Sequence, residues 1–74
     1  MEEDRKRVQE GLVKQYNNYY GIIVNNVGEE YDFLNRDVED KDIKQGDQVM
    51  FWAENHNLDN VDFHVARYVR KKSK

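Results

Sequence analysis

The chain contains no cysteine and no proline, and both absences restrict its class. Without cysteine it has no disulfide framework, no thiolate metal ligand and no cysteine nucleophile. Secreted domains of this size usually depend on such cross-links, so we expect an intracellular, cytoplasmic protein. Without proline, no β-strand is interrupted by a residue that cannot donate a backbone hydrogen bond.

Residues that carry catalysis or bind metals are equally scarce. There is no threonine, and Ser73 is the only serine, so hydroxyl nucleophiles with a partner base are not expected. The acidic residues of 37–47 lack the spacing of a calcium loop, and His56 and His64 have no cysteine partner for zinc. We therefore expect no enzyme, no cofactor and no metal site.

Hydrophobic runs are short, and charge is unevenly distributed. No run approaches the roughly 18 apolar residues of a membrane-spanning helix, and residues 1–10 have no apolar stretch that suits a signal peptide. Residues 11–66 have a net charge of −7, whereas residues 67–74 have a net charge of +5. An acidic body repels phosphate, so only the C-terminal residues are expected to attract nucleic acid by charge.

The 74 residues are enough for one domain, and their apolar pattern predicts strands. Runs at 12–16, 19–24, 31–34, 49–53 and 61–69 are separated by polar or turn-forming segments. In the fourth run, Val49, Phe51 and Ala53 alternate with Met50 and Trp52, which predicts that Met50 and Trp52 point outward. Five such strands predict a small closed barrel.

The segments outside these strands have their own expected roles. We expect a charged extension at 1–10, the domain at 11–69 and a solvated basic tail at 70–74. Residues 35–47 read as a long connection, with Val38 and Ile43 as apolar anchors and room for one helical turn. Residues 55–60 read as a polar loop.

Several segments resemble the cold-shock domain family, which has an OB-type fold. Residues 11–17 (GLVKQYN) stand where that family has Gly-x-Val-Lys-Trp-Phe-Asn, and residues 19–23 (YYGII) stand where it has Gly-Phe-Gly-Phe-Ile. Residues 31–35 (YDFLN) correspond to Val-Phe-Val-His-Phe, and residues 43–51 (IKQGDQVMF) resemble Leu-Lys-x-Gly-x-x-Val-x-Phe. The resemblance spans 11–69 and implies an all-β, five-stranded antiparallel OB-type barrel; an S1-type OB domain also fits the strand order.

The resemblance also implies a binding face for single-stranded nucleic acid, on which bases stack on exposed aromatic residues. Lys14 is kept, and Tyr20 replaces the first phenylalanine of the second strand. The other positions of that face differ from the family and are Gln15, Ile22, Asp32, Leu34 and Asn35. The inward positions stay apolar and are Val13, Ile23, Tyr31, Phe33, Val49 and Phe51.

Two functional hypotheses follow. The first is weak binding of single-stranded RNA or DNA through Lys14, Tyr19 and Tyr20, with phosphate contacts from a basic tail comprising Arg67, Arg70, Lys71 and Lys72. The simpler interpretation places Tyr16 in the core, Tyr19 over the barrel end and the tail in solvent.

The second hypothesis is a protein-interaction or self-association module that uses Met50 and Trp52, because exposed tryptophan is enriched at interfaces. Here the simpler interpretation is that Val8 covers these two side chains.

Overall fold

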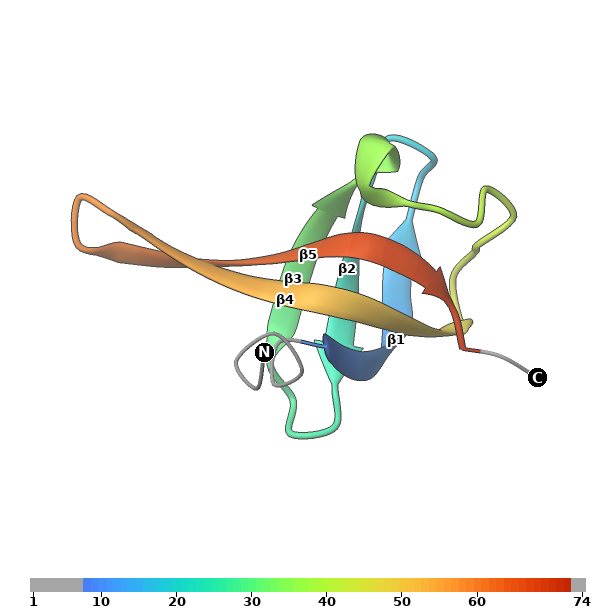
Figure 1. Ribbon diagram of the computed structural model, residues 1–74, viewed down its shortest axis with the longest axis horizontal. Coiled ribbons are helices and arrows are strands. Elements are labelled where there is room, and N and C mark those ends of the chain that lie inside the picture. The colour runs from blue at the N-terminus through green and yellow to red at the C-terminus, as the bar shows by residue number, and fades with distance from the viewer. Residues whose placement is uncertain (1–7, 73–74) are drawn as a thin grey trace.

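The computed structural model describes residues 8–72, which form one closed five-stranded barrel (Figure 1). The strands follow the order β1-β2-β3-β5-β4, and β4 pairs with β1 to close the barrel. All neighbours are antiparallel except β3 and β5, which run parallel and pair at Asp32 and Val65. This topology is consistent with an OB-like fold. The elements are β1 (Val8–Tyr16), β2 (Tyr20–Asn25), β3 (Glu30–Leu34), the 3-10 turn η1 (Asn35–Asp37), β4 (Gln48–Leu58) and β5 (Val61–Lys71).

The core confirms the alternation read from the sequence. The six residues predicted to point inward are all at most 3% exposed. The connection between β3 and β4 begins with η1, and its two predicted anchors, Val38 and Ile43, are also buried. The complete buried set comprises Val13, Ile23, Tyr31, Phe33, Val38, Ile43, Val49, Phe51, Ala53, Ala66 and Val69.

Strand lengths differ from the prediction at three places. Strand β1 begins at Val8 rather than near Gly11, because Val8, Gln9 and Glu10 pair with β4. Strand β5 extends to Lys71, so Arg70 and Lys71 lie in a strand rather than in a solvated tail. The expected polar loop at 55–60 is wrong: β4 continues to Leu58, and a two-residue turn at Asp59 and Asn60 leads into β5.

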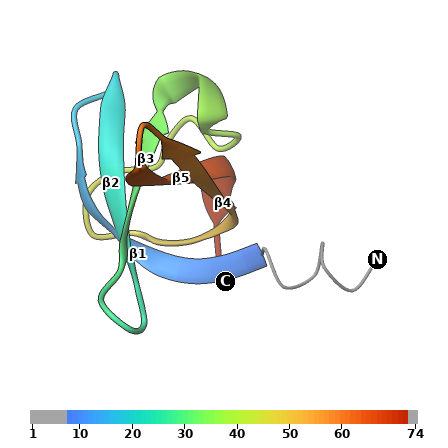
Figure 2. The same ribbon diagram turned by 90° about the vertical axis from the view of Figure 1, so that its left-hand side faces the viewer.

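That turn is tight because both residues take the left-handed conformation, with φ of 53° and 65°, as a two-residue hairpin requires. As a result, β4 and β5 continue past the barrel as a two-stranded ribbon (Figure 1). Figure 2 views the molecule from the side toward which this ribbon extends.

Strand β5 reaches the core through an irregular part of its ladder with β4. A register shift opposite Met50 and Trp52 interrupts its pairing with β4, and Tyr68 has a φ of 55° at this irregularity. The residues of β5 that enter the core are therefore Ala66 and Val69, while Val61 and Phe63 lie exposed on the ribbon. Within residues 8–72, no helix has the length and apolar character needed to cross a membrane.

Candidate nucleic-acid interface

The outer face of β2 and β3 is built from the residues that alternate with the core. Gly21 and Ile23 of β2 point inward, so Tyr20 and Ile22 lie on the outside. In the same way, Asp32 and Leu34 lie on the outside of β3. The ladder places Tyr20 opposite Leu34 and Ile22 opposite Asp32. The Asp32 carboxylate therefore lies on this face among three apolar or aromatic side chains, those of Tyr20, Ile22 and Leu34.

The turn between β1 and β2 positions Tyr19 and the first residue of β2, Tyr20, at the end of this face. The Asn17 Oδ1 atom accepts hydrogen bonds from the backbone N–H groups of Tyr19 (2.9 Å) and Tyr20 (3.0 Å). The N–H of Asn35 donates to the Tyr19 carbonyl at 2.8 Å. These bonds fix the turn, in which the Tyr19 side chain is 78% exposed and that of Tyr20 is 45% exposed.

A shallow hollow adjoins Tyr20, and β2, β3, η1 and β5 all contribute to it. Its floor includes Phe33 of the core, and its rim carries two arginines and two carboxylates. The lining residues are Tyr20, Asp32, Phe33, Leu34, Arg36, Asp37, Val65 and Arg67. The hollow therefore offers an aromatic wall and mixed charge rather than a uniformly basic surface.

Lys14 is positioned by an irregularity in β1. The pairing of β1 with β2 shifts between Val13 and Gln15, which makes Lys14 the extra residue of a bulge. Its Nζ atom lies 2.5 Å from the Glu30 Oε2 atom, and both side chains are about half exposed. Lys14 is thus near the face, but Glu30 already compensates its charge.

The predicted basic tail is the part of the site that the structure changes most. Strand β5 runs beside the acidic connection, and each of its cations meets a carboxylate. Arg67 lies 2.9 Å from Glu54 and 3.6 Å from Asp37. The other pairs are Arg70 with Glu39 (4.0 Å), Lys71 with Asp42 (3.1 Å) and Lys72 with Glu10 (2.9 Å).

The titration properties of these groups agree with the pairing. A hydrogen bond from Lys71 lowers the pKa of Asp42, and the same contact raises the pKa of Lys71. Burial by itself would raise the pKa of Glu54, but hydrogen bonds from His56 and Arg67 outweigh it, so that this pKa is lowered. Carboxylates of 37–47 therefore pair with Arg67, Arg70 and Lys71, while Arg67 also pairs with Glu54 and Lys72 pairs with Glu10.

Arg36 is different from these paired cations. Across residues 8–72, Arg36 and Lys41 are the basic residues for which no described carboxylate lies within 4.0 Å. Arg36 is exposed and lines the hollow next to Tyr20. Sequence reasoning missed it because it lies in the irregular connection, where no motif marks it.

Tyr16 belongs to the core side of the barrel, as its simpler interpretation expected. Its ring lies 5.2 Å from that of Phe33, and its hydroxyl accepts a 2.7 Å hydrogen bond from Asn35 Nδ2. The tyrosine is half-buried. Tyr16 therefore packs beneath the outer face of β2 and β3, and its ring does not offer a free surface on which a base could stack.

Met50 and Trp52 lie outside the barrel but are half-buried. The β1–β4 ladder sets Val8 opposite Trp52, and the Tyr68 ring meets the indole edge-to-face at 6.5 Å. A small hollow beside them also includes Glu39 and Arg70. Val8 and Tyr68 therefore lie beside Trp52 and cover part of the surface that the alternation of residues 49–53 predicted to be exposed to solvent.

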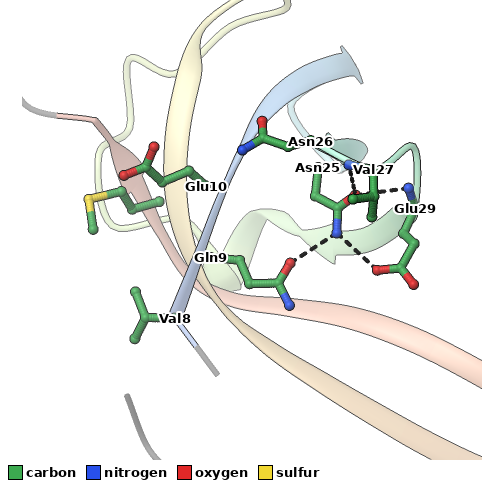
Figure 3. A pocket seen from close by; sticks show the side chains of 8 residues that line it. Val8, Gln9, Glu10, Asn25, Asn26, Val27 and Glu29 are labelled. Atoms are coloured by element: carbon green, nitrogen blue, oxygen red, sulfur yellow. Dashed lines mark hydrogen bonds between the residues drawn. The ribbon is translucent and has the colours of Figure 1, made fainter. Parts of the chain in front are cut away.

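The opposite end of the barrel carries a polar pocket around Asn25 (Figure 3). The Asn25 Nδ2 atom donates to Gln9 Oε1 (3.0 Å) and to Glu29 Oε1 (2.9 Å), and its Oδ1 accepts from the Val27 and Glu29 N–H groups. Burial raises the pKa of Tyr31, which approaches the same cluster. The bonds within the pocket hold the β2–β3 turn, so the pocket has a structural role.

Metal ligands do not gather at one place within the part of the chain that the structure describes, where no three histidine or carboxylate side chains lie in an arrangement suited to a metal ion. No protein-family model matches the sequence, and a search of curated proteins finds no matching relative.

Proposed function

We propose that this protein binds single-stranded RNA or DNA weakly through the outer face of β2 and β3. The observation that carries the proposal is the placement of the exposed Tyr20 beside Arg36 in one surface hollow, with Tyr19 on the adjoining turn. Aromatic rings and guanidinium groups stack on bases and contact phosphates, and no described carboxylate lies within 4.0 Å of the Arg36 guanidinium. The resemblance of residues 11–69 to the cold-shock family supports the same assignment by analogy.

The number of stacking groups limits the affinity. Each base stacked on an aromatic ring contributes about 1–3 kcal/mol, and this face offers Tyr20 and Tyr19. A micromolar complex needs about 8 kcal/mol, so the expected dissociation constant is micromolar or weaker. Asp32 weakens binding further because it places a negative charge beside the bases.

The ion pairs of β5 determine how binding responds to salt. Because the described cations of β5 already have carboxylate partners, they release few counterions when a strand binds. The slope of log affinity against log salt scales as about −0.7 for each phosphate contact of a single strand. With Arg36 as the main contact, we expect a slope of about −1.

Non-enzymatic function and a cytoplasmic location remain predictions.

Replacing Tyr20 with alanine is expected to weaken oligonucleotide binding by about tenfold, since one stacked base is worth roughly 1–3 kcal/mol. The measurement is fluorescence anisotropy of labelled single-stranded RNA and DNA. Val27→Ala is the control, because Val27 is 78% exposed in the turn at the other end of β2. Unchanged affinity in Tyr20→Ala would show that stacking does not occur at this face.

Replacing Glu30 with glutamine is expected to strengthen binding about two- to fivefold, because it frees Lys14 from its ion pair. The salt slope should steepen by about 0.7, the value for one additional phosphate contact. Glu29→Gln is the matched control, since it removes the same charge from the neighbouring residue, which does not contact Lys14. Equal gains in both variants would assign the effect to net charge and not to Lys14.

A protein-interaction function is the second candidate, and one specific observation favours it. Large apolar side chains, those of Leu58, Val61 and Phe63, lie exposed on the ribbon of β4 and β5, which extends past the barrel in Figure 1. Contiguous exposed apolar surface of this kind is typical of protein-contact sites.

A further inference from the structure

The ribbon formed by residues 54–65, called the arm below, contacts the described part of the barrel near its base, where the His64 ring meets the Tyr31 ring edge-to-face at 5.3 Å. The β1–β4 ladder is described up to Val8 and Trp52, and the β3–β5 pair lies at Asp32 and Val65. Beyond these points, the described strands pair with one another from Asn55 opposite His64 to Leu58 opposite Val61. The arm is the part of β4 and β5 that extends away from the barrel in Figure 1.

One face of the arm is polar and is satisfied by its own contacts. Directly opposed residues in an antiparallel pair share a face, so Asn55 lies beside His64 and Asn57 beside Asp62. Their side chains form cross-strand contacts of 2.6 Å and 2.7 Å. Side chains two residues apart on a strand share a face, so this polar face is the same face on which Ala53 and Ala66, nearer the barrel, point into the core.

The other face carries exposed apolar side chains toward the tip of the arm, together with Glu54 and His56, which contact each other at 3.0 Å. Leu58, Val61 and Phe63 are 64%, 51% and 43% exposed. His56 lies opposite Phe63 on the same face, and Val65 continues the stripe to the barrel. The polarity of the strands is therefore inverted along their length: inside the barrel the inward face is apolar, whereas on the arm the outward face is apolar.

The β5 edge of the arm is also uncovered among residues 8–72. A two-stranded hairpin is marginally stable by itself, and exposed edges normally carry lysine, proline or a covering segment. The arm has no lysine and no proline. Residues 61–64 of β5 have no second strand neighbour among the described residues. An additional strand at this edge would bury the apolar stripe and satisfy the free backbone groups.

Charge identifies the kind of strand that fits. The arm contains no lysine or arginine, and of its three carboxylates Glu54 is already paired with Arg67, so Asp59 and Asp62 carry its remaining negative charge. A phosphate backbone would be repelled by it, and a second arm would bring carboxylates against carboxylates. The exposed stripe, with three large side chains, is also small beside the roughly 800 Å² per partner of a standard interface. A short, basic segment of another protein matches both the charge and the size.

We propose that the arm docks an extended segment of a partner protein in which apolar and basic residues alternate. The segment adds to the edge of β5 at residues 61–64 and packs its apolar side chains on Leu58, Val61 and Phe63, as in other strand-addition complexes. Its basic side chains lie near Asp59 and Asp62. This inference does not depend on oligonucleotide binding, which uses Tyr20 and Arg36.

The test is an amide NMR titration of the full chain with an eight-residue peptide of alternating valine and lysine. We expect shifts at residues 58–65 and slowed hydrogen exchange at 61–64. A peptide of alternating valine and glutamate should bind at least tenfold more weakly. Failure of the lysine peptide to bind at millimolar concentration, equal binding of the two peptides, or shifts confined to the barrel would overturn the proposal.

A matched pair of variants tests the apolar side chains of the arm. Val61→Ser should weaken binding of the lysine peptide roughly tenfold, since the contact of one buried valine is lost. Val27→Ser, at a position that is 78% exposed in the β2–β3 turn outside the arm, should leave affinity within twofold. Circular dichroism of both variants verifies folding. Concentration-dependent dimerisation through the arm without peptide, or oligonucleotide shifts at 58–65, would also contradict the proposal by identifying a different occupant.

Discussion

Replacing Gly21 with alanine is expected to destabilise the barrel by about 3 kcal/mol or more, the upper part of the range for overpacked cores. Gly21 lies between Tyr16 of β1 and Phe33 of β3, where the strands bring a ring and a backbone together. A Cβ atom there would lie 2.5 Å from Phe33 Cζ and 2.6 Å from the Gln15 carbonyl oxygen. The ring can shift, but the carbonyl belongs to the β1 ladder and cannot move without breaking it.

Chemical denaturation monitored by circular dichroism measures this loss. Gly28→Ala is the control, because a Cβ at Gly28 meets nothing within 4 Å and only its φ of 89° resists the change. That variant should lose about 1 kcal/mol. A Gly21→Ala variant as stable as Gly28→Ala would contradict the close packing of β1, β2 and β3 at this point.

Truncating Phe33 to alanine is expected to cost about 3–5 kcal/mol of the free energy of unfolding. The ring is 1% exposed, stacks on Tyr16 at 5.2 Å and forms the floor of the hollow beside Tyr20. A domain of this size has a total stability of roughly 4–11 kcal/mol, so the variant should be partly or fully unfolded at room temperature.

Phe63→Ala provides a matched control for this prediction. The same atoms are removed, but Phe63 lies on the arm with 43% of its surface exposed. We expect a loss of about 1 kcal/mol or less, because most of that ring is not in the core. Urea titrations of the two variants should give well-separated midpoints. Equal losses would show that the arm is part of the cooperative core, contrary to the exposure of its apolar face.

The sequence was sufficient to predict the barrel because the strand period is local. Val49, Phe51 and Ala53 alternate with Met50 and Trp52, and such alternation directly reports which side faces the core. The turns were also predictable, since Asn17 and Gly28 are residue types that accept turn geometry. Local chemistry thus determined both the strands and most of their connections.

The arm was not predictable from the same signals. Residues 55–60 are mostly asparagine, aspartate and histidine, which are weak strand formers and typical of loops. Residues 55–58 nevertheless form strand, in which Asn55 and Asn57 find hydrogen-bond partners on β5 at His64 and Asp62. Such pairing depends on the register between β4 and β5, and the order of residues within 55–60 does not by itself indicate which residues of β5 they face.

The candidate site was predictable only in part for a similar reason. Tyr20 and Lys14 lie near the expected face, but the ion pairs that occupy Lys14, Arg67 and Lys71 depend on segments distant in sequence. The opposite charges of 37–47 and 67–71 were a signal that these segments meet. Arg36 had no such signal, because its position follows from η1.

The most direct test of nucleic-acid binding is an amide NMR titration of the full chain with single-stranded RNA and DNA oligonucleotides at low and moderate salt. We predict shifts centred on Lys14, Tyr20 and Arg36 that persist at moderate salt, because stacking contributes more than ion release. Shifts confined to Arg70, Lys71 and Lys72 that disappear with salt would contradict the account, as would no shifts at all. Either result would leave the arm as the remaining candidate for the principal binding surface.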